Sequence, residues 1–221
     1  MAEGEQTGPE ARYGLLLLTL VAAYLLSAVT HSDWAAAVHV GLVVVVLLLA
    51  VRHVRLRPRG TVLAIVVTVV TAIAAGVGAT SANTRAEGIA SIWNGLVLLL
   101  TVVLIIDRVV RLERVTAQSI YAALSSYLLI GLMFASFFGA LGYLVSGPFF
   151  ADNQPVNGQT LQYFSFTTLT TLGYGDFTAA GSLGRALAVL EALAGQVFLA
   201  TLVARLVSAY AGGRRRPPPG D

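Results

Sequence analysis

Oxygen-bearing side chains and glycines are concentrated in one short stretch, Thr170-Thr171-Leu172-Gly173-Tyr174-Gly175-Asp176. Glycine adopts backbone conformations that a Cβ disfavours, so Gly173 and Gly175 allow successive carbonyl groups to turn toward a common axis. Such an arrangement presents oxygen atoms to a cation and performs no covalent chemistry. A chance match to Thr-x-Gly-Tyr-Gly-Asp is on the order of one in ten thousand for a chain of this length. The stretch is therefore a candidate functional site rather than an incidental turn.

The overall composition indicates a membrane environment. Of the 221 residues, 57% are hydrophobic and 11% are charged, whereas a soluble domain carries roughly 25% charged residues. The absence of cysteine excludes disulfides, thiol chemistry and cysteine-based zinc sites. Arginines stand at the ends of apolar runs rather than on one basic face, so no nucleic-acid partner is expected. We expect an integral membrane protein whose surroundings are the lipid bilayer.

Six apolar runs are long enough to cross a membrane, which requires ~20 mostly apolar residues. The runs are Tyr13–Thr30, Trp34–Val51, Thr61–Ser81, Ile89–Ile106, Ile120–Val145 and Leu183–Tyr210. Between the last two, Thr160–Thr171 is too short to span and is rich in Phe, Tyr and Thr, which is typical of a re-entrant helix. We expect an all-α membrane protein, because open strands in lipid would leave backbone groups unpaired.

Arginine placement predicts the orientation of the chain. Twelve of the fourteen basic residues fall on one side of the predicted spans, and only Arg85 and Arg185 fall on the other. By the positive-inside rule, both termini are expected in the cytoplasm of a multi-pass protein of the cell membrane. The basic loops and the proline-rich tail are expected to lie near anionic lipids. A signal peptide at the first run is the alternative, but the segment preceding that run is acidic.

The candidate stretch resembles the selectivity filter of potassium channels, whose usual form is Thr-Val-Gly-Tyr-Gly followed by Asp. Leu172 replaces the common valine, which is a mild change because this position contributes a backbone carbonyl. The resemblance extends over about residues 120–210, in which Gln162–Thr168 looks like the pore helix and Gly181–Arg185 looks like the start of the inner helix. The chain thus resembles a prokaryotic six-transmembrane potassium channel with a degenerate voltage-sensor-like N-terminal half.

The resemblance implies a role for each residue of the stretch. Backbone carbonyls would replace the hydration shell of K⁺, and the hydroxyl of Thr171 would add an oxygen ring at the inner end. The implied filter residues are Thr171, Leu172, Gly173, Tyr174 and Gly175, with K⁺ sites at the first four; the implied supporting residues are Thr170, Asp176, Thr167 and Glu191. No cofactor is expected besides the permeant ion. One chain holds one filter, so a cyclic homotetramer is implied.

The last apolar run carries the residues that the resemblance assigns to the inner helix. Gly195 stands at the position of the family's hinge glycine and is interpreted as a gating hinge; a glycine that permits close helix packing is the alternative. A stripe with helical spacing matches cavity-lining positions, and the alternative is that it faces neighbouring helices. The stripe consists of Gln196, Leu199, Val203 and Val207.

Two acidic residues flank the expected filter. Glu191 is the one acid inside an apolar run, and such acids are candidates for function. We expect it to hydrogen-bond to Thr167 or Thr168 and to tune gating of the filter; an acid simply satisfied by hydroxyls is the alternative. Asp176 is expected to brace the filter or to concentrate cations. Some relatives pair this acid with an acid of the pore helix, but Thr167 occupies that position here.

A polar break divides the chain into two parts. The predicted units are a cytoplasmic N-terminal tail at 1–12, a four-helix transmembrane domain at 13–107, an interfacial linker helix at 108–119, a pore domain at 120–211 and a basic, proline-rich cytoplasmic tail at 212–221. A voltage sensor needs arginines within its fourth span, because charges must cross the field. Arg108, Arg111 and Arg114 have the spacing but follow the span, so weak voltage dependence is expected.

These features together predict a potassium-selective channel that conducts K⁺ passively and is not an enzyme. The expected architecture has six transmembrane helices, with a re-entrant pore helix and a selectivity filter between helices 5 and 6. A weakly selective cation channel is the main alternative. A secondary transporter would show inverted repeats and broken helices, neither of which the sequence contains. A membrane scaffold without transport is the last alternative.

Overall fold

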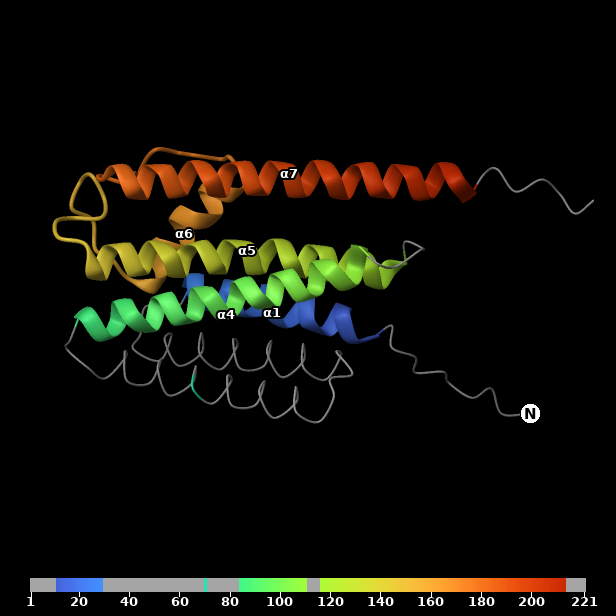
Figure 1. Cartoon of the computed structure of the whole chain (residues 1–221), viewed down its shortest axis with the longest axis horizontal. Coiled ribbons are helices and arrows are strands. Elements are labelled where there is room, and N and C mark those ends of the chain that lie inside the picture. Colours follow the sequence, from blue (N-terminus) through green and yellow to red (C-terminus); the bar gives the residue numbers. More distant parts are fainter. Residues whose placement is uncertain (1–10, 30–69, 71–83, 111–115, 214–221) are drawn as a thin grey trace, which may run out of the picture.

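The computed structural model describes residues 11–29, 70, 84–110 and 116–213. These residues form five labelled helices (Figure 1): α1 (Ala11–Val29), α4 (Thr84–Val110), α5 (Ala117–Leu144), α6 (Gly158–Leu169) and α7 (Ser182–Gly213). The described residues contain no strand, and their one isolated β-bridge joins Phe150 to Ala179. The predicted all-α fold is therefore confirmed for this part of the chain.

Three of the described helices are long and apolar enough to cross a membrane, namely α4, α5 and the Ser182–Ser208 part of α7. In α1 the apolar stretch is shorter, at Tyr13–Ala22. The runs predicted at Trp34–Val51 and Thr61–Ser81 lie outside the described residues, apart from position 70. The helices support a membrane protein, whereas the total of six spans stays a prediction.

Helix bounds differ from the predicted runs where capping residues set the ends. A capping box places the start of α6 at Gly158, because Asn157 Oδ1 accepts from the backbone N–H groups of Gln159 and Thr160. This helix ends at Leu169 rather than at Thr171, because Thr171 has a positive φ of 57°. The re-entrant helix predicted over Thr160–Thr171 is thus displaced toward the N-terminus.

The predicted linker helix at 108–119 is described only at its two ends. Residues 108–110 continue α4, which places Arg108 in the last turn, where a cation complements the helix dipole. At the other end, Thr116 caps α5 through a capping box with Ser119. Residues 111–115 lie outside the described residues.

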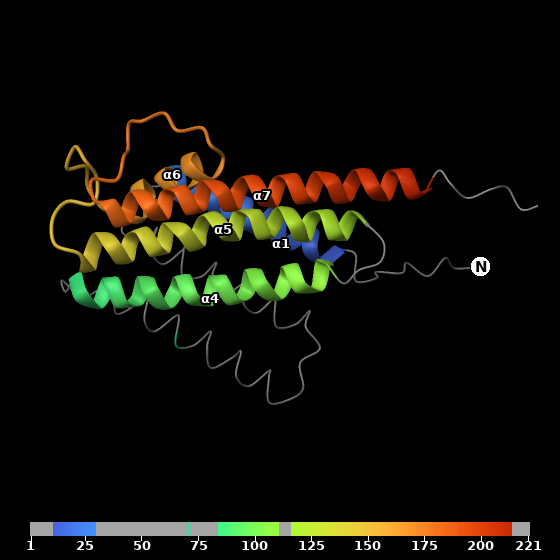
Figure 2. The same ribbon diagram turned by 45° about the horizontal axis from the view of Figure 1, so that its top comes forward.

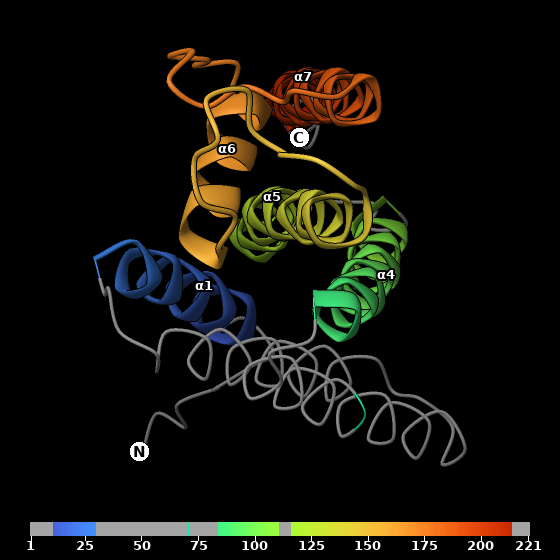
Figure 3. The same cartoon turned by 90° about the vertical axis from the view of Figure 1, so that its left-hand side faces the viewer.

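Helix α5 is the centre of the described structure. Figure 3 shows it in the middle, with α1, α4, α6 and α7 around it, and it packs against all four. The first residues of α1 and α5 lie at the same end of the bundle as the last residues of α4 and α7 (Figure 1). Arg108 and Arg205 thus lie toward one end, whereas Arg85 and Arg185 lie toward the other, as expected from the charge pattern.

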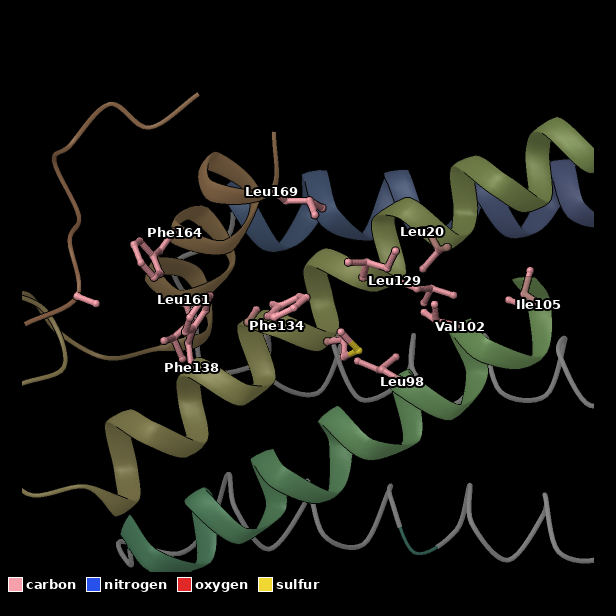
Figure 4. Close-up of a cluster of buried hydrophobic side chains, with 14 of the residues drawn as sticks. Leu20, Leu98, Val102, Ile105, Leu129, Phe134, Phe138, Leu161, Phe164 and Leu169 are labelled. Carbon is pink, nitrogen blue, oxygen red and sulfur yellow. The ribbon is translucent and has the colours of Figure 1, made fainter. Parts of the chain in front are cut away.

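One continuous hydrophobic cluster joins the helices (Figure 4). Toward one end of α5, Leu129 packs with aliphatic residues of α1 and α4, including Leu20, Leu98 and Val102. Toward the other end the cluster is aromatic, and it consists of Phe134, Phe138, Phe149, Phe150 and Phe164. Because α6 contributes Phe164 and Leu161 to this cluster, the short helix is held from behind by α5 and by the loop that follows α5.

Phe138 is the central residue of the aromatic part, and its removal tests the packing. Its side chain is fully buried, with ring centroids 4.8 Å from Phe164 and 5.7 Å from Phe149. We expect Phe138→Ala to lower the free energy of unfolding by about 3–5 kcal/mol, because it opens a cavity. Chemical denaturation of the purified protein in detergent micelles measures this change. The matched control is Leu99→Ala on the exposed face of α4; an equal loss in both variants would contradict the packing described.

Candidate functional site

The segment 170–176 follows α6 directly and is irregular. Thr170 caps the helix, and its Oγ1 donates to the carbonyl of Phe166 at 2.6 Å. The carbonyl of Thr167 accepts from the backbone N–H groups of Leu172 and Gly173, at 2.8 and 3.1 Å. The last turn of α6 therefore fixes the first residues of the segment through backbone hydrogen bonds. Thr167 supports the segment in this way with its carbonyl, while its hydroxyl donates to Phe164 within the helix.

Backbone dihedral angles alternate in sign along the segment. Thr171, Gly173 and Gly175 have positive φ values of 57°, 51° and 83°, whereas Leu172 and Tyr174 do not. A Cβ built at either glycine meets nothing within 4 Å, so these positions require glycine for the backbone conformation and not for space. Thr171 is β-branched, and its left-handed conformation is strained. Alternation of this kind allows successive carbonyl groups to point to the same side of the chain.

The segment lies on the surface of the single chain. Figure 2 shows the connection between α6 and α7 looping out beyond α7, on the side away from α4. All residues from Thr170 to Asp176 are exposed, and the side chain of Tyr174 is 69% exposed. The resemblance to the potassium-channel filter implies that the Tyr174 ring braces the segment from behind, but within one chain the exposed ring lacks the packing for that role. A polar, irregular segment is thus presented outward beside a helix that can cross a membrane.

Asp176 is held at the end of the segment by two residues that the sequence did not single out. The hydroxyl of Tyr163, in α6, donates to Asp176 Oδ2 at 2.7 Å. Gln154, in the loop before α6, donates from Nε2 to the backbone carbonyl of Asp176 at 2.7 Å. Phe177 N–H donates to Asp176 Oδ1 at 3.1 Å. The side chain opposite this acid is therefore a tyrosine one turn before Thr167, rather than an acid at position 167.

The hydrogen bond to Asp176 is the main cause that raises the pKa of Tyr163 to about 12, with smaller contributions from desolvation and from nearby charge. The hydroxyl is protonated and donates at neutral pH, and the raised pKa keeps it protonated to a higher pH than the ordinary value of 10.0 would. The bond is lost only as the pH rises through the pKa of the folded state.

Backbone hydrogen bonds connect the loop before α6 with the residues that follow the segment. The backbone N–H of Ala151 donates to Thr178 O at 2.9 Å, and that of Ala180 donates to Phe149 O at 2.8 Å. Arg185 donates from Nε to the carbonyl of Ala179 at 2.9 Å. The two backbone bonds join the loop before α6 to the chain that leaves the segment, and the Arg185 bond joins that chain to α7.

Glu191 is fully buried in α7 and lies against α6. The prediction that Glu191 hydrogen-bonds to Thr167 or Thr168 is wrong. Instead, Glu191 Oε1 lies 2.5 Å from the hydroxyl oxygen of Ser165. A helix turns by about 100° per residue, so Thr167 lies on the opposite face of α6 from Ser165, whereas Thr168 lies about one turn further along the helix. The interpretation of Glu191 as a support of the segment remains a prediction.

Gly195 and the predicted cavity stripe follow along α7. A Cβ at Gly195 would collide with the backbone carbonyl oxygen of Leu169. This contact supports the alternative interpretation, in which the glycine permits close helix packing. Helix α7 is continuous through this position, and the hinge role stays a prediction. Gln196 donates from Nε2 to Thr171 Oγ1 at 3.4 Å, which brings the first stripe residue to the segment. Val203 and Val207 are exposed and Leu199 is half-buried.

The residues that the sequence analysis missed share one property. The side chains of Tyr127, Gln154, Tyr163 and Ser165 each form a hydrogen bond to a residue at least 13 positions away in the sequence. Polar side chains in a short apolar helix are one signal that points to such contacts, because buried polar groups need partners. The partner itself becomes visible only once the helices are placed.

The bond between Tyr163 and Asp176 gives a testable titration. Asp176→Asn removes the negative charge, and we expect the pKa of Tyr163 to fall from about 12 toward 10.0. Ultraviolet titration of tyrosinate measures this change, with the spectrum of Tyr163→Phe subtracted in each background to isolate the one tyrosine. An unchanged pKa in Asp176→Asn would contradict the bond.

Comparison with known proteins finds one similarity, in the C-terminal region of the chain. Residues 124–211 match the family model described as an ion channel. This match begins within α5 and includes α6, the segment 170–176 and most of α7. No curated protein and no solved structure is significantly similar to the chain. The match supports an ion channel, which is a non-enzymatic class of protein, and this support comes from residues 124–211.

Proposed function

We propose that the protein is a potassium-selective channel that conducts K⁺ passively through a pore formed by four copies of the chain. The observation that carries the proposal is the segment 171–175, which has alternating φ signs and is exposed beside α7. Carbonyl oxygens replace the water shell of a dehydrated cation without a full charge that would trap the ion. The carbonyls of Thr171 to Tyr174 are the K⁺ ligands, and no other cofactor takes part.

The environment of the segment favours a homotetramer. Irregular backbone at membrane depth is stable only where it is buried in protein or lines a water-filled cavity. In one chain, Thr171, Tyr174 and Asp176 are exposed, and they lie beside a helix that would otherwise face lipid. Apolar side chains of α7 such as Val189, Val197 and Val203 are also more than half exposed. Four copies around an axis place the polar segment on an ion path and cover these side chains.

Packing of α6 supports the assignment of the pore helix. This helix has 12 residues, too few to span, and its C-terminal end leads directly into the segment. The C-terminal end of a helix carries partial negative charge, which stabilises a cation nearby. Gln196, Leu199, Val203 and Val207 line the cavity below the filter in this arrangement, with Gln196 already beside Thr171.

Placement in the membrane follows the arginine pattern. The chain is a multi-pass protein of the cell membrane with six spans and both termini in the cytoplasm. The end of the bundle that carries Arg108 and Arg205 faces the cytoplasm, where anionic lipids attract basic residues.

Potassium flux in liposomes tests the proposed function, with Gly173→Ala as the disabling variant. The positive φ of Gly173 costs an alanine roughly 1–2 kcal/mol in each of four copies, so we expect flux to fall at least about tenfold. Gly181→Ala is the matched control, because its Cβ meets nothing and its φ is not positive.

Barium is expected to block the wild-type flux. Sodium flux equal to potassium flux, seen as a reversal potential near zero in mixed gradients, indicates the weakly selective alternative and contradicts K⁺ selectivity.

Weak voltage dependence is expected, because the described α4 carries its arginines only at its ends. Arg85 lies in the first turn and Arg108 in the last, and neither lies in the apolar middle of the helix. Conductance–voltage curves of the reconstituted protein measure this. We expect Arg108→Gln combined with Arg111→Gln to leave the slope unchanged; a steep curve that this double variant abolishes would contradict the interpretation.

A further inference from the structure

Helices α5, α6 and α7 meet at a buried polar contact behind the filter segment. The hydroxyl oxygen of Ser165, in α6, lies 2.6 Å from the carbonyl oxygen of Gly131, in α5, and 2.5 Å from Glu191 Oε1, in α7. The side chains of Ser165 and Glu191 are fully buried. We name this contact, formed by Gly131, Ser165 and Glu191, the serine layer.

A second contact lies one helical turn away in all three helices. The carbonyl oxygen of Leu169, in α6, accepts from Tyr127 Oη, in α5, at 3.2 Å. On the other side, the backbone of α7 approaches the same carbonyl so closely that Gly195 has no room for a Cβ. Each of these residues is four positions from its counterpart in the serine layer, which is the spacing of one turn. The two layers together hold the end of α6 that leads into the filter.

Counting protons in the serine layer gives the ionisation state of Glu191. A serine hydroxyl has one hydrogen and donates to one acceptor, and a backbone carbonyl only accepts. Ser165 contacts two acceptor oxygens if Glu191 is a carboxylate, so one of the two short oxygen–oxygen distances would have no hydrogen between its atoms. A carboxylic acid removes the conflict: Glu191 donates to Ser165, and Ser165 donates to Gly131.

The surroundings of Glu191 agree with the neutral form. In the described part of the chain, its Oε2 atom is buried and has no hydrogen-bond partner. The titratable group of α5 that lies near it is Tyr127, whose hydroxyl hydrogen is already donated to Leu169. An ionised carboxylate in this place would be a buried charge without a second donor, whereas the acid leaves only one carbonyl-type oxygen unpaired.

We infer that Glu191 is a neutral carboxylic acid that acts as a positioning residue, donating the hydrogen bond that joins α7 to the pore helix. Its side chain does not ligate the permeant ion; it fixes Ser165 and, with the Gly195 contact, the end of α6. The consequence for conduction rests on the proposed function, but the ionisation state and the hydrogen-bond chain do not.

Infrared difference spectroscopy of the full-length protein in lipid tests the ionisation state. We expect wild type to show a protonated carboxyl C=O band at neutral pH that is lost in Glu191→Gln. The matched control is Glu87→Gln, an acid in the first turn of α4, which is expected to keep the band. If wild type minus Glu191→Gln shows only carboxylate bands, the inference is overturned.

Two serine variants keep the test decisive if Glu191→Gln does not fold. Ser165→Ala removes the acceptor of the acid, so the C=O band is expected to shift. Ser125→Ala removes a buried hydroxyl of α5 that has no partner in the described part of the chain, and the band is expected to stay in place. A band that ignores Ser165→Ala contradicts the hydrogen-bond chain.

Hydrogen exchange at the end of α6 tests the positioning role. In Ser165→Ala, amide exchange over residues 166–172 is expected to rise about tenfold, the factor for loss of one hydrogen bond. Glu191→Gln is expected to stay within about threefold of wild type, because the amide N–H replaces the acid O–H as donor. An equal rise in both variants would contradict donation by Glu191, because the amide N–H of glutamine would then not replace the acid O–H. Neither readout requires ion flux, so absence of potassium flux would refute the proposed function alone.

Discussion

Irregular backbone inside a membrane is stable only when the surrounding protein holds it, because lipid offers no hydrogen-bond partners. In the proposed channel the segment 170–176 is such a backbone, and the rest of the described structure supports it. Asn157 starts the short helix α6 at a fixed residue, and the buried aromatic cluster around Phe138 holds that helix from behind. Tyr163 and Gln154 hold the far end of the segment at Asp176. The carbonyls of 171–175 are thereby free of helical hydrogen bonds and available to an ion.

Helices α5 and α7 differ in how far the single chain buries them. Helix α5 is buried by α1, α4, α6 and α7 and stabilises the single chain (Figure 3). Helix α7 is largely exposed, and it carries the residues nearest to the inner end of the segment. In the proposed fourfold pore, further subunits cover the polar segment and the apolar helix that one chain leaves exposed. In this proposal, conduction and assembly depend on the same surface.

Much of this arrangement could be predicted from residue types at close spacing. The stretch Thr170–Asp176, the short helix before it and the long apolar helix after it all have local signatures. Contacts between helices could not be predicted, because they depend on rotation about each helix axis. Ser165 rather than Thr167 meets Glu191 for this reason, and Tyr163 meets Asp176 although the two are 13 residues apart. The sequence left two interpretations of Gly195 open, because a hinge and a close helix contact both require glycine, and only the placement of Leu169 against α7 shows the contact.

The most direct test of the central claim is a density map of the assembled protein in membrane-like lipid, collected with the K⁺ substitute Tl⁺ or Rb⁺. Ion density on a fourfold axis, lined by the backbone oxygens of residues 171–175 from four copies, is the predicted result. Placement of this segment away from every symmetry axis, or an axis lined by other residues, would contradict the assignment of the segment as the ion path.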